Sequence, residues 1–490
     1  MMLNFSELQL GELPKPTQMM LADGSVLTIN AVVRVLPNAR VVVRGNLNQE
    51  AVYAKIYIGH RASIHADREA EGTKHLNTAN ILTPKLLLET TSQNQPVIVY
   101  EAIENALNAE DFMRQSDYLS RREMALNLVQ AVAQHHAANL MQTDIHLKNF
   151  IVAGAKTKAE GIYTIDGDGI VTSSSQSQKQ RNLATFLSKF DVLDDDFMQE
   201  SVEAYCVARN EKFELNQFVK TYLWTQKIRQ KTASDYADKK VFRTCTDVKV
   251  IDDRPNLLHI SRQFNVENQL LDDMNVYLNV PSKNIKNGNT CTIGVAQIGD
   301  KQIVIKRYNI KSFWHGIKLG LRQSRAKKSW ANAHRLQIYN IATPQPLALV
   351  FECDYALNNR DYFLSEFIDA PDIAEFFAST ESEELKKSVA FETARLFYKL
   401  SLLKIVHGDC KATNIKIKDG KPVLLDLDAM FVSKSLFLYE KQHVRDLKRF
   451  MQNWQNDTET TALLNNAFKL GYSGDDEFSV PSALIQAGIA

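Results

Sequence analysis

The stretch that decides the fold reads His407-Gly-Asp-Cys-Lys-Ala-Thr-Asn414-Ile, and the stretch Gln142-Thr-Asp-Ile-His-Leu-Lys-Asn149-Phe repeats its pattern. In each, an aspartate is followed five residues later by an asparagine and then by a short apolar run. Before each stretch, apolar residues recur at three- and four-residue spacing, over Glu383–Leu403 and Arg121–Leu140, which predicts a long helix. A pattern of this length that recurs within one chain predicts two copies of one architecture.

The repeat continues on both sides of these stretches. Downstream, an apolar run ends in Asp166-Gly-Asp168 in one copy and in Asp426-Leu-Asp428 in the other. Upstream, a single lysine stands in a strand-like run in each copy, Val52-Tyr-Ala-Lys55-Ile and Ile303-Val-Ile-Lys306-Arg. We therefore predict an α+β chain of two tandem domains, each with a small β-rich lobe followed by a larger helical lobe.

Length and composition agree with two folded domains. The chain has 490 residues, of which 44% are apolar and 23% charged, so it is too long for one ordinary core and too apolar for a disordered protein. The stretch from Glu211 to Pro255 is polar and rich in Lys and Arg. We place the domain boundary there, which gives a first domain over residues 1–250 and a second over 251–490.

Cysteine usage and hydropathy bear on the compartment. The five cysteines are odd in number and include no Cys-x-x-Cys pair, which argues against a zinc site or a disulfide framework and fits a reducing cytoplasm. The first twenty residues have no apolar core, so we expect no signal peptide. We also expect no membrane-spanning helix, since no run of about eighteen apolar residues occurs.

The residue types in the repeat point to phosphoryl transfer from ATP, which depends mainly on positioning and charge compensation. A lysine neutralises the phosphates, and an aspartate accepts the proton of the attacking hydroxyl. An asparagine and a further aspartate hold Mg²⁺, a cation that prefers oxygen ligands. The second copy offers Lys306 as the phosphate ligand, Asp409 as the base, Lys411 beside the transferred group, and Asn414 with Asp426 as metal ligands.

The first copy offers the same roles through Lys55, Asp144, Asn149 and Asp166. Gln142 stands where the second copy has His407, and His146 stands where it has Lys411, with Lys148 as a candidate replacement. Two interpretations of this copy stay open, a second catalytic domain and a degenerate domain kept as a scaffold.

Two further features of the nucleotide site differ between the copies. A kinase lysine is usually held by a helix glutamate; Glu69 fits this role in the first copy, with Glu71 as second choice, whereas Ser329 takes its place in the second. The second copy has a glycine-containing stretch, Asn287–Gly294, that could cover the phosphates or form a plain hairpin turn. The first copy has Leu36–Arg40 there, with no glycine.

Together these residues resemble the lipopolysaccharide kinase family, bacterial enzymes that phosphorylate Kdo or heptose in the lipopolysaccharide inner core. The resemblance rests most on His407–Ile415 with Leu424–Met430, and on Ser324–Leu336, where the serine at 329 is similar to a variation within the family. Thr143–Ile151 is similar more loosely. The resemblance implies protein-kinase-like domains, ATP and Mg²⁺ as cofactors, and a sugar hydroxyl as acceptor.

One segment of this nearly neutral chain is strongly basic. Residues 301–336 carry ten Lys and Arg and no Asp or Glu, and Lys311–Arg322 sets aromatic residues among these cations. This composition is typical of an interfacial helix on anionic lipid, so we expect an anionic glycolipid acceptor and peripheral contact with the inner face of the inner membrane through residues 311–335. A solvated basic helix is the alternative. No nucleic-acid module is visible, so nucleic acid is not an expected partner.

Three hypotheses follow for the whole chain. The first is an ATP-dependent kinase of the lipopolysaccharide core. The second is a small-molecule or protein kinase with the same architecture. The third is a non-enzymatic tandem pseudokinase that binds partners, which the retention of all four polar roles in both copies argues against.

Overall fold

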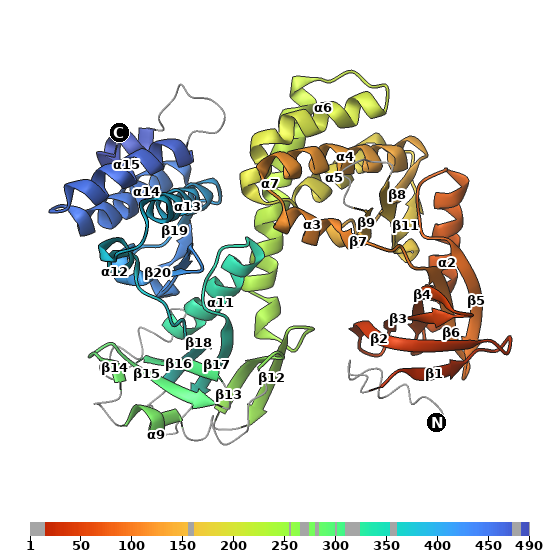
Figure 1. Cartoon of the computed structure of the whole chain (residues 1–490), viewed down its shortest axis with the longest axis horizontal. Helices are drawn as coiled ribbons and strands as arrows, with labels where there is room; N and C mark the ends of the chain where they lie inside the picture. The colour runs from red at the N-terminus through yellow and green to blue at the C-terminus, as the bar shows by residue number, and fades with distance from the viewer. Residues whose placement is uncertain are drawn as a thin grey trace. The chain divides into compact units, whose positions relative to one another are not determined.

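The chain forms two compact units, residues 1–190 with 194–229 and residues 191–193 with 230–490 (Figure 1). The computed structural model describes residues 15–154, 161–253, 256–264, 274–279, 284–298, 301–308, 324–352, 360–472 and 482–489. Both units combine antiparallel strands with helices, so the mixed α+β character predicted from the sequence is confirmed.

The first unit begins with an antiparallel sheet in the order β1-β2-β3-β4-β6-β5. Its strands are β1 (Thr17–Met20), β2 (Val26–Leu36), β3 (Arg40–Leu47), β4 (Glu50–Tyr57), β5 (Leu86–Ser92) and β6 (Gln95–Glu101). Alternate residues of the central strands are fully buried, as Val41 and Val43 are in β3, and they form the core of the sheet. Helix α2 (Ala62–Thr78) follows the lysine strand β4 and packs against β6.

The rest of the first unit is mainly helical and lies at the other end of the unit from the sheet (Figure 1). It contains β7 (Ala106–Asn108), α3 (Ala109–Gln115), α4 (Tyr118–Ala137), β8 (Leu140–Gln142), β9 (Phe150–Ala153), β10 (Ile162–Thr164), β11 (Ile170–Thr172), α5 (Gln176–Leu187) and α6 (Met198–Ala208). Asp117 caps α4 by accepting a hydrogen bond from the Ser120 amide, and the buried Leu128 and Val132 of this helix pack into the core.

The second unit begins with a sheet in the order β12-β13-β17-β18-β16-β15-β14. Its strands are β12 (Val248–Asp253), β13 (Asn256–Ser261), β14 (Asn284–Asn287), β15 (Cys291–Ile298), β16 (Lys301–Tyr308), β17 (Pro346–Glu352) and β18 (Arg360–Glu366). The lysine strand β16 lies between β15 and β18, as β4 lies between β3 and β6 in the first unit. The hairpin of β12 and β13 extends the β17 edge and has no described counterpart in the first sheet.

Short helices and a helical region complete the second unit. These elements are α9 (Met274–Leu278), α11 (Arg325–Ile338), α12 (Ile373–Ala378), α13 (Glu383–Leu402), β19 (Ile405–Val406), β20 (Ile415–Lys418), β21 (Lys421–Leu424), β22 (Phe431–Val432), α14 (Leu436–Met451), α15 (Thr458–Tyr472) and α16 (Ser482–Ala487). Their core is rich in aromatic contacts; Phe397, Phe450 and Phe468 meet one another with ring centroids 5.0–5.9 Å apart.

Residues 211–255, the stretch expected to hold the end of the first domain and the connection, are largely helical. Helix α7 (Leu215–Ala237) occupies most of it, and the units divide between Arg229 and Gln230, inside this helix. The predicted boundary at residue 250 falls within β12, a strand of the second sheet. Composition did not reveal the helix because its buried positions include polar side chains, Thr221, Thr225 and Arg229.

Candidate active site

In both units a hairpin brings the asparagine of the Asp-x4-Asn motif next to the Asp-x-Asp motif. Strands β9 and β10 pair in the first unit, and β20 and β21 pair in the second. Just beyond each hairpin, the amide of Ile165 donates to the Asn149 carbonyl at 2.9 Å, and the amide of Leu425 donates to the Asn414 carbonyl at 2.8 Å. Residues more than ten positions apart are thereby fixed beside each other in the same way in both units.

The first aspartate of each Asp-x-Asp has an unusual backbone. Asp166 has φ 73° and Asp426 has φ 55°, both in the left-handed region that side-chain-bearing residues rarely adopt. The surrounding hydrogen bonds must offset the strain, and non-glycine residues held in this way tend to lie at functional sites. In each unit this conformation turns the carboxylate towards the sheet lysine.

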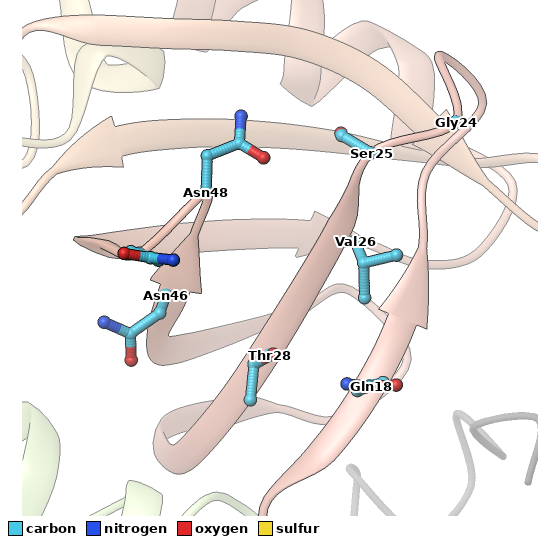
Figure 2. Close-up of a pocket in the computed structure, with 8 residues that line it drawn as sticks. Gln18, Gly24, Ser25, Val26, Thr28, Asn46 and Asn48 are labelled. Carbon is cyan, nitrogen blue, oxygen red and sulfur yellow. The ribbon is translucent and has the colours of Figure 1, made fainter.

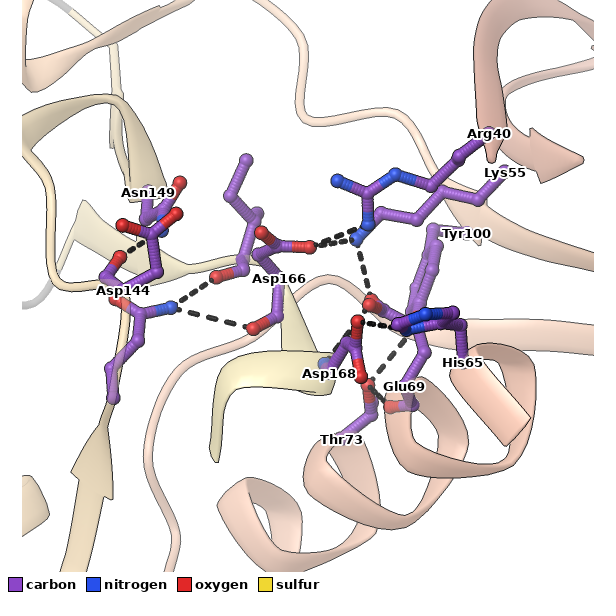
Figure 3. A network of polar contacts seen from close by, with 12 residues as sticks. Arg40, Lys55, His65, Glu69, Thr73, Tyr100, Asp144, Asn149, Asp166 and Asp168 are labelled. Atoms are coloured by element: carbon purple, nitrogen blue, oxygen red, sulfur yellow. Dashed lines mark hydrogen bonds and ion pairs between the residues drawn. The ribbon is translucent and has the colours of Figure 1, made fainter. Parts of the chain in front are cut away.

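In the first unit, Lys55 of β4 lies between two carboxylates. Its Nζ is 2.6 Å from Glu69 Oε1, on α2, and 3.0 Å from Asp166 Oδ1. Arg40, the first residue of β3, adds a contact of 2.9 Å to the same Asp166 oxygen. Figure 3 shows Asp166 between this cationic pair and the two residues Asp144 and Asn149.

These cations determine the charge state of Asp166. Burial alone would raise the pKa of this carboxyl, but the Lys55 ammonium and the Arg40 guanidinium outweigh burial and hold the pKa well below its usual range. Asp166 is therefore ionised at neutral pH.

Glu69 is the best-anchored residue of the first site. Its side chain is 1% exposed, and it accepts hydrogen bonds from the Tyr100 hydroxyl at 2.9 Å and from the Asp168 amide at 3.1 Å. Helix α2 approaches the Asp166–Asp168 loop closely at Gly72, because a Cβ there would lie 2.0 Å from the Gly167 carbonyl oxygen. The two glycines thus let the helix bring Glu69 to the lysine.

The loop that carries the Asp-x4-Asn motif of the first unit brings Asp144 and Asn149 together. Asn149 is buried and donates from Nδ2 to the Asp144 carbonyl at 2.9 Å. Gln142 donates from Nε2 to the Ile165 carbonyl at 2.8 Å. Lys148, the candidate replacement for Lys411, instead pairs with Glu110 at 3.0 Å, and its side chain is mostly exposed. Burial lowers the pKa of Lys189, which sequence reasoning did not single out, and the charge of Asp144 partly opposes this effect.

The second unit assembles the corresponding residues. Lys306 Nζ is 2.5 Å from Asp426 Oδ1, and burial of Asp426 is again outweighed by the lysine, which keeps the pKa of this carboxyl below its usual value. Asn414 donates from Nδ2 to Asp409 Oδ2 at 3.1 Å, and Lys411 Nζ lies 3.2 Å from the same carboxylate oxygen. The five predicted site residues of this unit therefore form two contacting groups.

His407 fixes the loop of the second unit, as Gln142 does in the first. Its Nε2 lies 2.9 Å from the Leu425 carbonyl oxygen, the position that matches Ile165. The amides of His407 and Gly408 donate to the buried carboxylate of Asp446, on α14, at 2.8 and 3.1 Å. The exchange of His407 for Gln142 thus preserves one hydrogen bond, which the sequence alone did not predict.

In the second unit, Ser329 occupies the helix position at which the first unit has Glu69, and the contacts around this position differ. Ser329 is buried on α11 and lies 2.8 Å from the Tyr308 hydroxyl, so it does not contact Lys306 in any described interaction. Lys306 instead has a second carboxylate partner, Asp428, at 3.0 Å. Asn332, three residues after Ser329, donates to the Leu427 carbonyl at 2.9 Å where the first unit has its close glycine approach.

The sites also contain residues that sequence reasoning did not select. They are Arg40, Tyr100, His65 with Asp168 in the first unit, and Arg325 with Asp428 in the second. The repeated second aspartate of Asp-x-Asp was a visible signal, since it recurs in both copies. Arg40 gave no such signal, because it stands at the start of β3 and comes near Asp166 only when the unit folds.

Several other predictions fall elsewhere in the structure. Asn287–Gly294 forms the end of β14, a turn and the start of β15, the hairpin alternative. The basic stretch Lys311–Arg322 lies outside the described residues. Among the helices that the structure describes, none is long and apolar enough to cross a membrane.

A shallow groove of about 650 Å³ lies on the first sheet, away from these residues. Figure 2 shows it lined by amide and hydroxyl side chains such as Gln18, Thr28, Asn46 and Asn48. None of the predicted site residues lines it.

The side chains present suit a nucleotide with a hard divalent cation. Each unit gathers a lysine, an ionised aspartate and a buried asparagine, and Mg²⁺ commonly takes only one or two carboxylates from the protein and fills its other positions with phosphate and water. In the part of the chain that the structure describes, no group of three His, Cys, Asp or Glu forms a protein-only metal cage. The lysine, aspartate and asparagine of each unit fit a metal that is delivered with phosphate, since phosphate and water fill the positions that the protein leaves open.

A lysine on a sheet, with an asparagine and an aspartate held together by a hairpin, is the arrangement expected of an ATP-dependent phosphotransferase. Residues 44–208 and 281–472 each match the family model described as the lipopolysaccharide kinase (Kdo/WaaP) family, and the two matches together span well over half of the chain. The chain belongs to this family, so the resemblance seen in its motifs is confirmed, and it is an ATP-dependent kinase.

Two individual proteins are also similar to parts of the chain. A probable bifunctional tRNA threonylcarbamoyladenosine biosynthesis protein of Methanosphaera stadtmanae is 29% identical over 202 residues, 41% of this chain and 35% of that protein. The chain thus spans about a third of the length of this curated relative. A solved structure of WaaP in complex with acyl carrier protein aligns with 41% of this chain and 87% of its own, at 18% identity and a TM-score of 0.33.

Proposed function

We propose that this kinase phosphorylates sugar hydroxyls, of Kdo or heptose, in the bacterial lipopolysaccharide inner core. Family membership supports the acceptor class. The observation that carries the proposal is the matching contact of sheet lysine and loop aspartate in both units, Lys55 with Asp166 at 3.0 Å and Lys306 with Asp426 at 2.5 Å. The architecture we propose is therefore two tandem protein-kinase-like domains.

In the second unit, Asp409 is the proposed base, which accepts the proton of the acceptor hydroxyl. Its carboxylate is about one-third exposed, which leaves an edge for a substrate, while Asn414 and Lys411 hold its other contacts. Lys411 is placed to compensate charge on the transferred group, Lys306 to bind phosphate oxygens, and Asn414 with Asp426 to hold Mg²⁺. ATP with Mg²⁺ supplies the phosphoryl group and neutralises its charge.

In the first unit, Asp144 is the proposed base and Lys55 the phosphate ligand, positioned by Glu69. Asn149 and Asp166 are the proposed magnesium ligands. Arg40, which contacts Asp166 at 2.9 Å, adds a second cation on the phosphate side. The complete set of contacts supports a second working site rather than a scaffold.

The site of action that we propose is the cytoplasmic side of the inner membrane, where the glycolipid acceptor would be reached. The basic composition of residues 311–335 supports peripheral contact with anionic lipid.

The curated relative favours one alternative. Its name connects a related sequence to tRNA modification, so a kinase acting on a protein or small molecule in that setting is the second candidate. A tandem pseudokinase scaffold is the third, and the ionised aspartate beside each lysine argues against it.

The test is transfer from radiolabelled Mg-ATP to purified core glycolipid, with Asp409→Asn, Asp144→Asn and the double variant as matched proteins. We expect each single variant to remove the phosphate from one sugar position, read by mass spectrometry, and the double variant to remove both. Wild-type transfer equal to that of the double variant would refute the proposal. Transfer to a protein or small molecule but not to glycolipid would favour the second candidate.

A further inference from the structure

The second aspartate of Asp-x-Asp contacts the same helix position in both units. Asp168 Oδ2 lies 2.8 Å from His65 Nδ1, and Asp428 Oδ2 lies 2.7 Å from Arg325 Nη2. His65 precedes Glu69 by four residues on α2, and Arg325 precedes Ser329 by four residues on α11. In each unit, the residue that contacts the second aspartate therefore lies one helical turn before the position that is Glu69 in the first unit and Ser329 in the second.

What differs is the partner of the lysine. In the first unit Glu69 contacts Lys55 directly, and Asp168 offers Glu69 only its backbone amide. In the second unit Lys306 lies 3.0 Å from the Asp428 oxygen that also binds Arg325. In the first unit, the Glu69 carboxylate on the helix thus contacts the lysine directly. In the second unit, Arg325 on the helix contacts Asp428 of the loop, and Asp428 contacts the lysine.

Burial makes Asp428 a strong partner for Lys306. The Asp428 side chain is 9% exposed and that of Lys306 10%, whereas the Asp426 side chain is 31% exposed. Shielded charges interact more strongly than solvated ones. Both cations also lie over the Tyr308 ring, at 5.0 Å for Lys306 and 5.2 Å for Arg325. Tyr308, Ser329 and Asp428 together occupy the surroundings that Glu69 dominates in the first unit.

The role proposed for Asp426 adds a reason for a second carboxylate. A carboxylate that holds magnesium has less charge to offer the lysine, so Lys306 then needs another anion. Asp428 supplies one that lies outside the proposed set of metal ligands.

We propose that Asp428 is the positioning residue of the second site, where it replaces the absent helix glutamate and links α11 to Lys306 through Arg325. This rests on the proposed function only in that Lys306 binds nucleotide phosphates. It predicts that the two units depend on different residues to bind the same nucleotide, the first on Glu69 and the second on Asp428.

The experiment measures nucleotide binding by each unit of the full chain separately. The probe is 8-azido-ATP with Mg²⁺, photocrosslinked at increasing concentration, and peptide mass spectrometry reads labelling of each unit. A hydrogen bond to a charged group contributes enough free energy to change an equilibrium about ten- to a hundredfold, and we expect this change in nucleotide binding because Lys306 loses the anion that positions it. We therefore expect Asp428→Asn to raise the half-saturating concentration by this factor for peptides of the second unit, and Asp428→Glu, which keeps the charge, to recover most of it.

The first unit provides the matched control. Asp168→Asn changes the same position, but Lys55 keeps Glu69, so the shift for peptides of the first unit should stay below about threefold. Equal shifts for Asp168→Asn and Asp428→Asn, or no recovery with Asp428→Glu, would overturn the positioning role. Thermal melting of each variant shows whether it is folded. No labelling of wild type would overturn the nucleotide site itself, whereas wild-type labelling that Asp428→Asn leaves unchanged would overturn only this inference.

Discussion

The unequal anchoring of the two sheet lysines gives a quantitative prediction for stability. In Lys55→Met, the Glu69 carboxylate is left buried at 1% exposure without its cation. Removing one partner of a buried ion pair costs about 3–5 kcal/mol, because the other charge stays desolvated. Glu69 keeps its hydrogen bonds from the Tyr100 hydroxyl and the Asp168 amide, which offset about 1 kcal/mol, so we expect a loss of about 2–4 kcal/mol.

Lys306→Met is the matched variant and should cost much less. After this change Asp428 keeps Arg325, and Asp426, with a side chain 31% exposed, is solvated by water. We expect a loss of about 1 kcal/mol, because the buried Asp428 keeps a cation and the carboxylate left without one, Asp426, is partly exposed. The same substitution thus has unequal effects because only the first unit leaves a fully buried carboxylate unpaired.

The measurement is native-state hydrogen exchange read peptide by peptide, which gives the free energy of unfolding of each unit separately. The double variant Lys55→Met/Glu69→Leu serves as the control, since it removes both charges and should be more stable than Lys55→Met alone. Equal losses for the two lysine variants, or no recovery in the double variant, would refute the reasoning.

Three further predictions concern the second unit. Trp330 is fully buried, and its indole donates to the Val241 carbonyl. Trp330→Ala should therefore lower the free energy of unfolding by about 3–5 kcal/mol, measured by urea unfolding. Asp446→Ala leaves the amides of His407 and its neighbour without their acceptor, so turnover by this unit should fall at least about tenfold while the first unit continues, measured by product mapping. Burial lowers the pKa of His443 from 6.5 to about 4, so between these pH values only the unfolded chain gains a proton at this residue. This difference should lower the stability by up to about 3 kcal/mol as the pH drops from 6.5 to 4. In pH-dependent melts, His443→Gln should flatten this slope.

Much of the molecule was predictable from local patterns. The Asp-x4-Asn spacing at Asp409 places a loop carboxylate and an amide within one short turn, and the structure brings them to 3.1 Å. The helical periodicity over Glu383–Leu403 corresponds to α13, because the buried residues of a helix recur at its own period. The family assignment, drawn from the same motifs, is confirmed by the family match over both copies.

Other features could not be predicted from the sequence, because they depend on contacts between residues that are far apart along the chain. The pairing of Arg40 with Asp166 spans 126 residues and requires that the start of β3 and the end of the β9–β10 hairpin face each other. The equivalence of Gln142 and His407 became visible only when both were found to bond the same carbonyl position. Helix α7 was missed since its buried face carries polar residues such as Arg229, which pairs with Asp195 at 2.9 Å.

The sequence by itself determined the recurrence of the motifs, the family and the order of the chemical groups, because these are properties of residue type and spacing along the chain. Only the tertiary structure decided how each sheet lysine is held, by Glu69 in one unit and by Asp428 in the other. Ion pairing depends on distance and burial in space, and a missing glutamate on a helix can be replaced by a carboxylate from a loop about one hundred positions away.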